Sequence, residues 1–505
     1  MTHIPYLSLL IWLPMLSALP IAFLNKRDHI NASRWVALLV SVATLAISVY
    51  LYVIFDTSTY AMQFREYHAW IPALKIYYDI GVDGISLPLI ALSCFTSVVI
   101  ILASWQMVEE RVAAYLAAFM VMQGTVIGVF AALDAMLFYF FWEAMLIPMY
   151  LSIGIWGMKN RIFASTKFFL YTFFGSALML AALIYLGVKA GSFRILDFYQ
   201  LEIPMGDQIW LFFGFFLAFA IKIPMWPMHT WLPDAHTEAP TGGSVILAAL
   251  MLKLGGFGFL RFSLPIVPDA CQYLDWAMII LSLIAIVYIG FVAIVQKDMK
   301  KLIAYSSVAH MGFVTLGCFI IFVIIKHTAS IQEAYMALEG SMVQMISHAF
   351  GSGAMFLAFG LIYLQMHTRD IKDFGGIAKV MPVFTGFFVL YCLSNIGLPG
   401  TSGFVGEFMI IMSAFKASYW ATFFAALTLI VGAVYTLRMV SNVYYGPIVS
   451  DKVKALTDIT PMMKFLFMVL AIMIIAIGVY PELLLREFHA TIKHLLDLSL
   501  QSRLP

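Results

Sequence analysis

Charged residues are scarce in this chain of 505 residues. It contains 29 Lys and Arg and 27 Asp and Glu, so only 11% of its residues are charged, whereas soluble domains have about 25%. The net charge of +2 provides no excess of positive charge for phosphate groups. Large soluble enzymes, disordered proteins and nucleic-acid-binding proteins are therefore excluded.

Motifs for metal ions, redox centres and nucleotides are also missing. The four cysteines, Cys94, Cys271, Cys318 and Cys392, stand alone in apolar runs, so we expect buried apolar residues and not ligands of zinc or an iron–sulfur cluster. There is no P-loop, and the Gly-Gly-Phe-Gly stretch at 255–258 lies in an apolar segment, which favours close helix packing over phosphate binding. We expect no cofactor and no metal in this chain.

Apolar residues make up 63% of the sequence, and its mean hydropathy is +0.95. A helix needs about 20 such residues to cross a bilayer. The sequence therefore predicts an all-α polytopic membrane protein with about 14 transmembrane helices. The expected segments are 4–24, 31–55, 81–104, 112–132, 134–156, 162–188, 208–231, 240–263, 274–296, 301–325, 337–364, 380–412, 418–445 and 461–480.

The positive charges indicate how the chain crosses the membrane. If the amino terminus lies outside, most Lys and Arg residues fall in the alternate loops on the inner side, as the positive-inside rule requires. The sequence thus predicts a multi-pass protein of the bacterial inner (plasma) membrane with both termini on the periplasmic side.

Four charged residues lie deep within the expected segments, away from the segment ends: Glu143, Lys222, Lys253 and Glu407. A charge at the centre of a membrane helix costs about 2.5–3.5 kcal/mol on insertion scales, so such residues are rare. An inert ion pair that fixes helix register is the structural alternative. Two acids and two lysines are more than that role requires, and we interpret them as functional.

The seventh segment breaks beside Lys222. Pro224 and Pro227 follow it, and proline removes a backbone donor and clashes with the preceding turn. A broken helix at membrane depth must be buried in protein or line an aqueous cavity. A lysine there is suited to exchange protons, whereas the alternative is a kink with a snorkelling lysine. No residue within one turn of Glu143 can neutralise its charge, so a charged partner must come from another helix.

The twelfth segment breaks at Gly397-Leu-Pro-Gly-Thr-Ser-Gly403, and Glu407 follows near the start of the second half. Five segments separate the two breaks in chain order, and an odd-numbered unit reverses its orientation when it repeats. The sequence therefore predicts two inverted five-helix repeats, each with a broken helix, as in many transporters. The expected domains are an N-terminal group of three transmembrane helices, a first repeat, a second repeat, and a last helix with a tail, at 1–108, 109–265, 266–447 and 448–505.

Two histidines lie near mid-segment in the chain between Lys253 and Glu407. His310 and His348 stand on apolar helices, where a lone histidine is often a hydrogen-bonded core residue. Their place among intramembrane charges favours a polar relay.

Several motifs resemble one family over nearly the whole chain. The stretch from Lys222 to Ser244, with Pro-Met-Trp-Pro-Met-His-Thr-Trp-Leu-Pro-Asp-Ala-His, is similar to the antiporter-like subunits of proton-pumping NADH:quinone oxidoreductase (respiratory complex I). Phe-Phe-Trp-Glu143, Leu-Lys253-Leu-Gly-Gly and the stretch from Gly397 to Glu407 resemble it too. Chain length and a glutamate at the second break are most similar to the M-type branch.

The resemblance implies a role for each residue. Glu143 would modulate the lysine Lys222, Lys253 would connect the two halves, and Glu407 would exchange protons with the outside. His310 and His348 would belong to the polar axis. The flavin (FMN), iron–sulfur clusters and quinone site would reside in partner subunits. The partners would be other membrane-arm subunits, including the neighbouring antiporter-like L and N chains, and lipid.

The resemblance therefore implies a proton-translocating subunit coupled to electron transfer elsewhere in the complex. The nearest alternative is a subunit of a multisubunit sodium/proton antiporter, which shares the Lys222 motif. A solitary solute transporter and a passive scaffold are further alternatives. The scaffold predicts that all four buried charges can be neutralised without loss of function.

Overall fold

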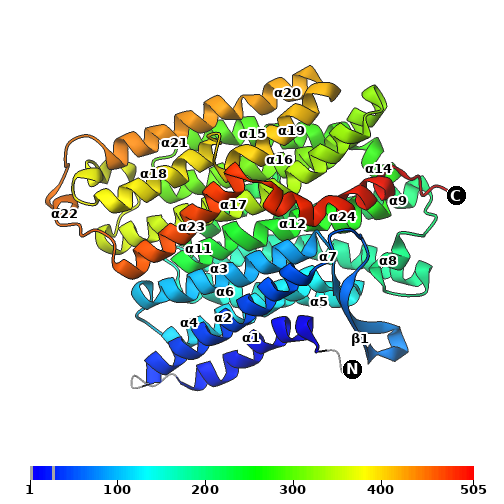
Figure 1. Cartoon of the computed structure of the whole chain (residues 1–505), viewed down its shortest axis with the longest axis horizontal. Coiled ribbons are helices and arrows are strands. Elements are labelled where there is room, and N and C mark those ends of the chain that lie inside the picture. The colour runs from blue at the N-terminus through cyan, green and yellow to red at the C-terminus, as the bar shows by residue number, and fades with distance from the viewer. Residues whose placement is uncertain (1–3, 25–28) are drawn as a thin grey trace. The chain divides into compact units, whose positions relative to one another are not determined.

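The computed structural model describes residues 4–24 and 29–505, and the regular secondary structure of this part consists of helices and one β-hairpin. Figure 1 labels most of its elements. The bounds are α1 Tyr6–Phe23, α2 Ile30–Ile54, β1 Gln63–Ile71, β2 Ile76–Val82, α3 Ser86–Met107, α4 Val112–Ala131, α5 Ala135–Ala144, α6 Leu146–Trp156, α7 Arg161–Ala190, α8 Ile195–Phe198, α9 Met205–Lys222, α10 Trp231–Glu238, α11 Thr241–Ile246, α12 Leu252–Gly258, α13 Leu264–Ile266, α14 Pro268–Tyr273, α15 Asp275–Ile294, α16 Met299–Thr328, α17 Ile331–Met366, α18 Pro382–Ile396, α19 Ser402–Ala417, α20 Tyr419–Ala426, α21 Thr428–Tyr444, α22 Asp451–Lys454, α23 Pro461–Val479 and α24 Glu482–Leu500.

The polytopic helical fold is confirmed. Among the described residues, 13 helical stretches are long and apolar enough to cross a membrane. The twelfth expected segment, 380–412, is instead two shorter helices, α18 and α19, which meet at the predicted break. The count of spans by length is therefore 13, and the inverted repeats stay a prediction.

Two elements were not predicted from the sequence. The third segment was expected from residue 81, but residues 76–82 form β2, which pairs with β1 in an antiparallel hairpin. Helix α24, Glu482–Leu500, follows the last span and lacks the hydropathy of a span. A search for apolar runs of about 20 residues misses both, because a short strand and an amphipathic helix mix polar and apolar residues.

The chain forms two compact units. Unit 1 contains residues 1–223, 253–274 and 486–505, and unit 2 contains residues 224–252 and 275–485. The helical stretch Thr241–Ile266 contributes residues to both. The four-domain division expected from the sequence stays a prediction.

Glycines allow close helix contacts in unit 1. A Cβ atom added to Gly255 would lie 2.7 Å from the amide nitrogen of Ile223 and from the carbonyl oxygen of Phe219. A Cβ at Gly258 would lie 2.4 Å from the Phe219 ring. The packing role predicted for the Gly-Gly-Phe-Gly stretch is thus confirmed, and it brings this helix against the end of α9.

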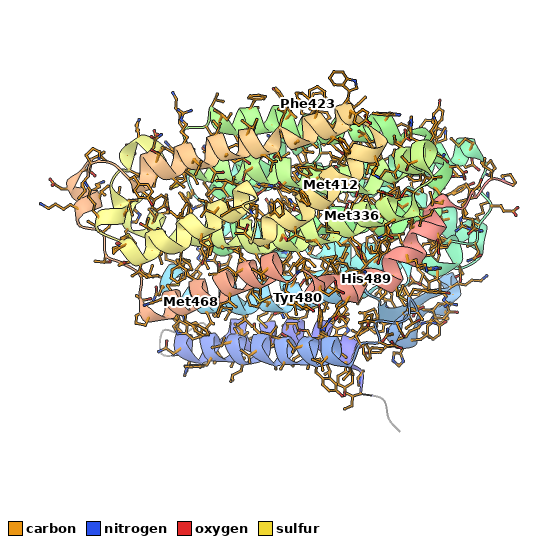
Figure 2. All side chains as sticks on the ribbon, turned by 45° about the horizontal axis from the view of Figure 1, so that its top comes forward. Met336, Met412, Phe423, Met468, Tyr480 and His489 are labelled. Carbon is orange, nitrogen blue, oxygen red and sulfur yellow. The ribbon has the colours of Figure 1, made fainter. Side chains whose placement is uncertain are left out.

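In unit 2, α16 and α17 are mostly buried and pack against each other and against α19. The outer helices expose apolar side chains instead. Phe423 of α20, labelled in Figure 2, has 55% of its surface exposed. Apolar side chains exposed in this way suit a lipid-facing surface.

Candidate functional site

Lys222 is the last residue of α9, and the helix ends there because Pro224 cannot continue its hydrogen bonding. The side chain is buried, with Nζ 5.1 Å from the centre of the Trp142 ring and 5.9 Å from that of Phe168. Within the described part of the chain, Nζ makes no hydrogen bond. The ammonium group is therefore held by aromatic faces, which attract cations, and the predicted break beside Lys222 is present.

Glu143 lies on α5, next to a turn at Met145 that separates α5 from α6. Its carboxylate faces the hydroxyl groups of Tyr139 and Ser176 and interacts electrostatically with Lys222. Tyr139 lies on α5 itself, whereas Ser176 belongs to α7 and Lys222 to α9, so the charged partner comes from another helix, as expected. The structure thus brings Glu143 and Lys222 into one site in unit 1.

Lys253 is fully buried on α12. Two π-helical stretches, Leu247–Met251 and Phe259–Ser263, flank this helix. Departures of this kind from α-helical geometry are frequent at functional sites. The neighbouring Gly255 packs against the end of α9 that bears Lys222.

A second site lies in unit 2, where α16, α17 and α19 meet. Nδ1 of His310 is 2.6 Å from Oε1 of Glu407, and the amide of Gln344 donates to the same oxygen at 3.0 Å. The rings of His310 and His348 are 5.9 Å apart. All four side chains are buried. The structure therefore brings together His310, His348 and Glu407, which are far apart in the sequence.

The second predicted break positions Glu407. Helix α18 ends at Ile396, Gly397 adopts a positive φ of 80°, and α19 begins at Ser402. Glu407 lies in the second turn of α19, beyond the first turn where the helix dipole is strongest. The hydrogen bonds from His310 and Gln344 are therefore the main local interactions of its carboxylate.

Several buried polar residues of unit 2 were not predicted from the sequence. Gln344 stands one turn before His348 on α17, and this spacing was a signal that could have revealed it. His236 of α10 is buried and stacks on Phe356 of α17, with ring centres 4.3 Å apart. Lys300, at the start of α16, is also buried. The sequence placed Lys300 in a loop and gave His236 no role.

Arg261 lies near the end of the expected segment 240–263 and was given no role from the sequence, and the structure buries it in unit 1. Its Nη2 atom is 2.7 Å from Oδ2 of Asp83, and both side chains are shielded from solvent. The π-helical stretch at 259–263 extends the helix past the expected end, because its apolar neighbours continue to Ile266. Arg261 and Asp83 thus form a buried ion pair.

We expect Arg261→Met to lower the free energy of unfolding by about 3–5 kcal/mol, because it leaves the Asp83 carboxylate buried without its partner. The control is Arg194→Met. Arg194 is partly exposed and lies 3.6 Å from Asp79, so its loss should cost at most about 1 kcal/mol. Thermal unfolding of the purified assembly compares the two variants, and equal effects would contradict this assignment.

Asp134, just before α5, is the N-cap of that helix. Its side chain accepts hydrogen bonds from the backbone amides of Met136, Leu137 and Tyr77. Burial raises the pKa of Asp134 to about 6, although these hydrogen bonds act in the opposite direction. Asp134 therefore stabilises the start of the helix that holds Glu143.

Comparison with known proteins gives consistent matches. Residues 132–432 match the family described as NADH:quinone oxidoreductase/Mrp antiporter, and residues 9–129 match the amino terminus of NADH-ubiquinone oxidoreductase chain 4. The chain is 44% identical to NADH-quinone oxidoreductase subunit M of Rhodobacter capsulatus over 97% of this chain and 96% of that protein. It is 41% identical to NADH-ubiquinone oxidoreductase chain 4 of Chondrus crispus over 92% of each.

Two solved structures share the fold. A chain of respiratory complex I from Thermus thermophilus has a TM-score of 0.87 and 27% identity, over 98% of this chain and 99% of that chain. A chain of the Mrp complex from Dietzia has a TM-score of 0.84 and 19% identity, with all of both chains covered. The second similarity concerns the fold alone.

Proposed function

Because the chain belongs to the membrane subunits of the NADH:quinone oxidoreductase/Mrp antiporter family, as a subunit M of the oxidoreductase, we propose that its buried ionisable side chains move protons across the membrane. The chain is a proton-translocating membrane-arm subunit of NADH:quinone oxidoreductase. Its enzyme activity is that of the H⁺-translocating complex.

The proposed proton-transfer residues of unit 1 are Glu143, Lys222 and Lys253. The carboxylate of Glu143 interacts with the ammonium group of Lys222, so a change of charge beside Glu143 alters how strongly Lys222 holds its proton. We propose that electron transfer in other subunits produces such a change. Lys222 then releases a proton towards Lys253.

The proposed residues of unit 2 are His310, His348 and Glu407. Histidine changes charge near neutral pH, and the 2.6 Å contact between His310 and Glu407 allows a proton to be shared between the two rings and the carboxylate. Glu407 then passes the proton to the outside. This buried histidine–carboxylate contact is the observation that supports proton transfer best.

We expect His310→Gln to lower NADH-driven proton translocation by about 10²-fold or more, which is the lower range for the loss of a proton-transferring group. Glutamine can still hydrogen bond to Glu407 but does not take up a proton. The control is His68→Gln, since His68 lies exposed on β1. Acidification of vesicles that contain the complex measures both variants, and unchanged translocation in His310→Gln would contradict the proposal.

The remaining assignments are also proposals. The absence of nucleotide and cluster motifs supports placing FMN, the iron–sulfur clusters and the quinone site in partner subunits. The match to a chain of complex I supports other membrane-arm subunits as partners, and we propose that these include the L and N chains. The bacterial relatives support the inner membrane, and the distribution of Lys and Arg supports periplasmic termini.

The alternative is a subunit of a sodium/proton antiporter of the Mrp type. The family description includes both kinds of protein, and the Dietzia Mrp chain has the same fold. Identity over nearly the full chain favours the oxidoreductase subunit. A pH gradient that sodium collapses without NADH or quinone would favour the antiporter.

A further inference from the structure

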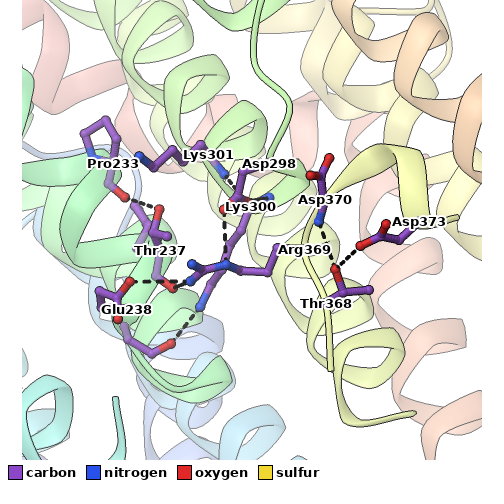
Figure 3. Close-up of polar contacts among 12 residues, drawn as sticks. Pro233, Thr237, Glu238, Asp298, Lys300, Lys301, Thr368, Arg369, Asp370 and Asp373 are labelled. Carbon is purple, nitrogen blue, oxygen red and sulfur yellow. Dashed lines mark hydrogen bonds and ion pairs between the residues drawn. The ribbon is translucent and has the colours of Figure 1, made fainter. Parts of the chain in front are cut away.

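Four charged side chains gather where α10 ends and α16 begins, in unit 2. Arg369 lies between two carboxylates, with Nη1 3.5 Å from Oε1 of Glu238 and Nε 3.1 Å from Oδ2 of Asp298. Arg369 also donates to the carbonyl oxygen of Thr237 at 2.7 Å. Figure 3 shows these three side chains together with Lys300, the fourth charged residue. We call Glu238, Asp298, Arg369 and Lys300 the α10–α16 cluster.

Lys300 differs from the other members of the cluster because its side chain hydrogen bonds to a neutral group and not to a charged one. Its Nζ atom donates to the carbonyl oxygen of Ala239 at 2.6 Å, and only 2% of the residue surface is exposed. The two carboxylates of the cluster are engaged by Arg369 instead. An ammonium group that is buried without a carboxylate of its own is costly to keep charged, so it is suited to give up its proton.

The cluster also favours return of that proton. When Lys300 is neutral, the positive charge of Arg369 balances only one of the two carboxylates, and the cluster has a net charge of −1. When Lys300 is protonated, the four charges sum to zero. Arg369 and Asp298 are partly exposed, with 25% and 21% of their side-chain surfaces accessible. The cluster therefore extends from solvent to a buried lysine.

A cavity lies beside the start of α16, and its lining includes residues adjacent in the chain to members of this cluster. This cavity of about 480 Å³ is lined by Lys297, Leu302, Asp370 and other residues of unit 2. Asp370 follows Arg369 directly and pairs through its backbone with Asp298. The cavity thus lies next to the chain neighbours of Asp298 and Arg369, which are the partly exposed members of the cluster.

Polar groups continue from Lys300 towards the histidines. On α16, Lys300, Ser307 and His310 are spaced by seven and three residues, so they share one helix face. Ten residues of helix correspond to about 15 Å between Lys300 and His310. The hydroxyl of Ser307 lies 3.0 Å from that of Ser352, which stands one turn after His348 on α17.

His236 is a further polar residue between Lys300 and the pair of His310 and Glu407. It is three residues before Ala239, the partner of Lys300, and it stacks on Phe356, one turn after Ser352. The buried side chains between Lys300 and the His310–Glu407 contact thus include a titratable ring and a pair of hydroxyl groups. Such groups can hold a chain of hydrogen bonds.

We propose that Lys300 is the proton-loading residue of unit 2, which takes protons from the aqueous side at the α10–α16 cluster and delivers them towards His310 and Glu407. This inference rests on the proposed function of that site. The groups that face Lys300 from neighbouring elements are Glu238 of α10, Asp298 at the start of α16, and Arg369. Arg369 is a positioning residue, because it engages the carboxylates that Lys300 would otherwise pair with.

Lys300→Arg tests this proposal most directly. Arginine keeps the positive charge and a donor for the Ala239 carbonyl but does not release its proton. We expect NADH-driven proton translocation in vesicles to fall about tenfold or more, since transfer by a positioned acid or base is lost. The matched control is Lys301→Arg, because Lys301 is the next residue on α16 and contributes only its backbone amide to Asp298.

A merely structural role for Lys300 predicts the opposite result. If Lys300→Arg translocates protons as the parent complex does, the proposal is overturned. Lys300→His adds a second measurement, the pH dependence of translocation, which a purely structural role of Lys300 would not change. We expect the pH above which translocation falls to shift towards acid, because histidine ordinarily has a lower pKa than lysine, and an unchanged pH profile would also overturn the proposal.

The same series separates this inference from the proposed function. If His310→Gln stops translocation while Lys300→Arg leaves it intact, the His310–Glu407 site stands and loading at Lys300 is wrong. If neither variant changes translocation, the proposed function of unit 2 fails as well. Assembly of each complex is checked by its NADH oxidation with a protonophore present.

Discussion

Lys222→Ala is expected to abolish proton translocation while the complex still assembles. The ammonium group of Lys222 lies against Trp142 and Phe168 and interacts with the carboxylate of Glu143. Alanine removes the proton carrier and leaves Glu143 without this charge. Moving one proton against 100 mV costs about 2.3 kcal/mol. Without Lys222, unit 1 has no group at this position that can carry the proton.

NADH-driven acidification of vesicles measures the loss, and NADH:quinone reductase activity is recorded in the same preparation. We expect the coupled reductase activity to fall strongly too, because electron transfer is linked to translocation. Lys189→Ala is the control, since Lys189 is exposed at the end of α7. Full translocation in an assembled Lys222→Ala complex would refute the assignment.

Glu407→Gln should lower proton translocation by about 10²-fold or more, since the amide has nearly the shape of the carboxylate but takes up no proton. The carboxylate accepts hydrogen bonds from His310 and Gln344 on two other helices. Glutamine keeps an oxygen for these contacts, so the helices should remain packed. The expected loss therefore reports proton transfer and not assembly.

Two further variants sharpen this test. Glu407→Asp keeps a titratable group and should retain part of the translocation. Glu333→Gln is the matched control, because Glu333 is a half-buried carboxylate on α17 that lies 3.5 Å from Lys416 at the end of α19. If Glu333→Gln and Glu407→Gln reduce translocation equally, Glu407 has no special role.

Local sequence was sufficient for the spans and their interruptions. Runs of about 20 apolar residues predicted nearly every membrane helix, since the free energy of burying a helix in lipid is set by its own side chains. Prolines after Lys222 and glycines before Glu407 predicted both breaks, because their backbone limits act within one turn. The sequence alone also identified the charges at mid-span, such as Lys222, Lys253 and Glu407, since a charge inside an apolar run is visible without a structure.

Only the tertiary structure decided which of these residues meet. His310 and Glu407 are 97 positions apart, and Arg261 and Asp83 are 178 positions apart. Such contacts depend on which helix faces pack together, and one sequence without a fold does not specify the pairs. The same reason explains why the sequence placed Lys300 in a loop and gave Arg261, near the end of its segment, no role: their burial is determined by helices distant in the chain.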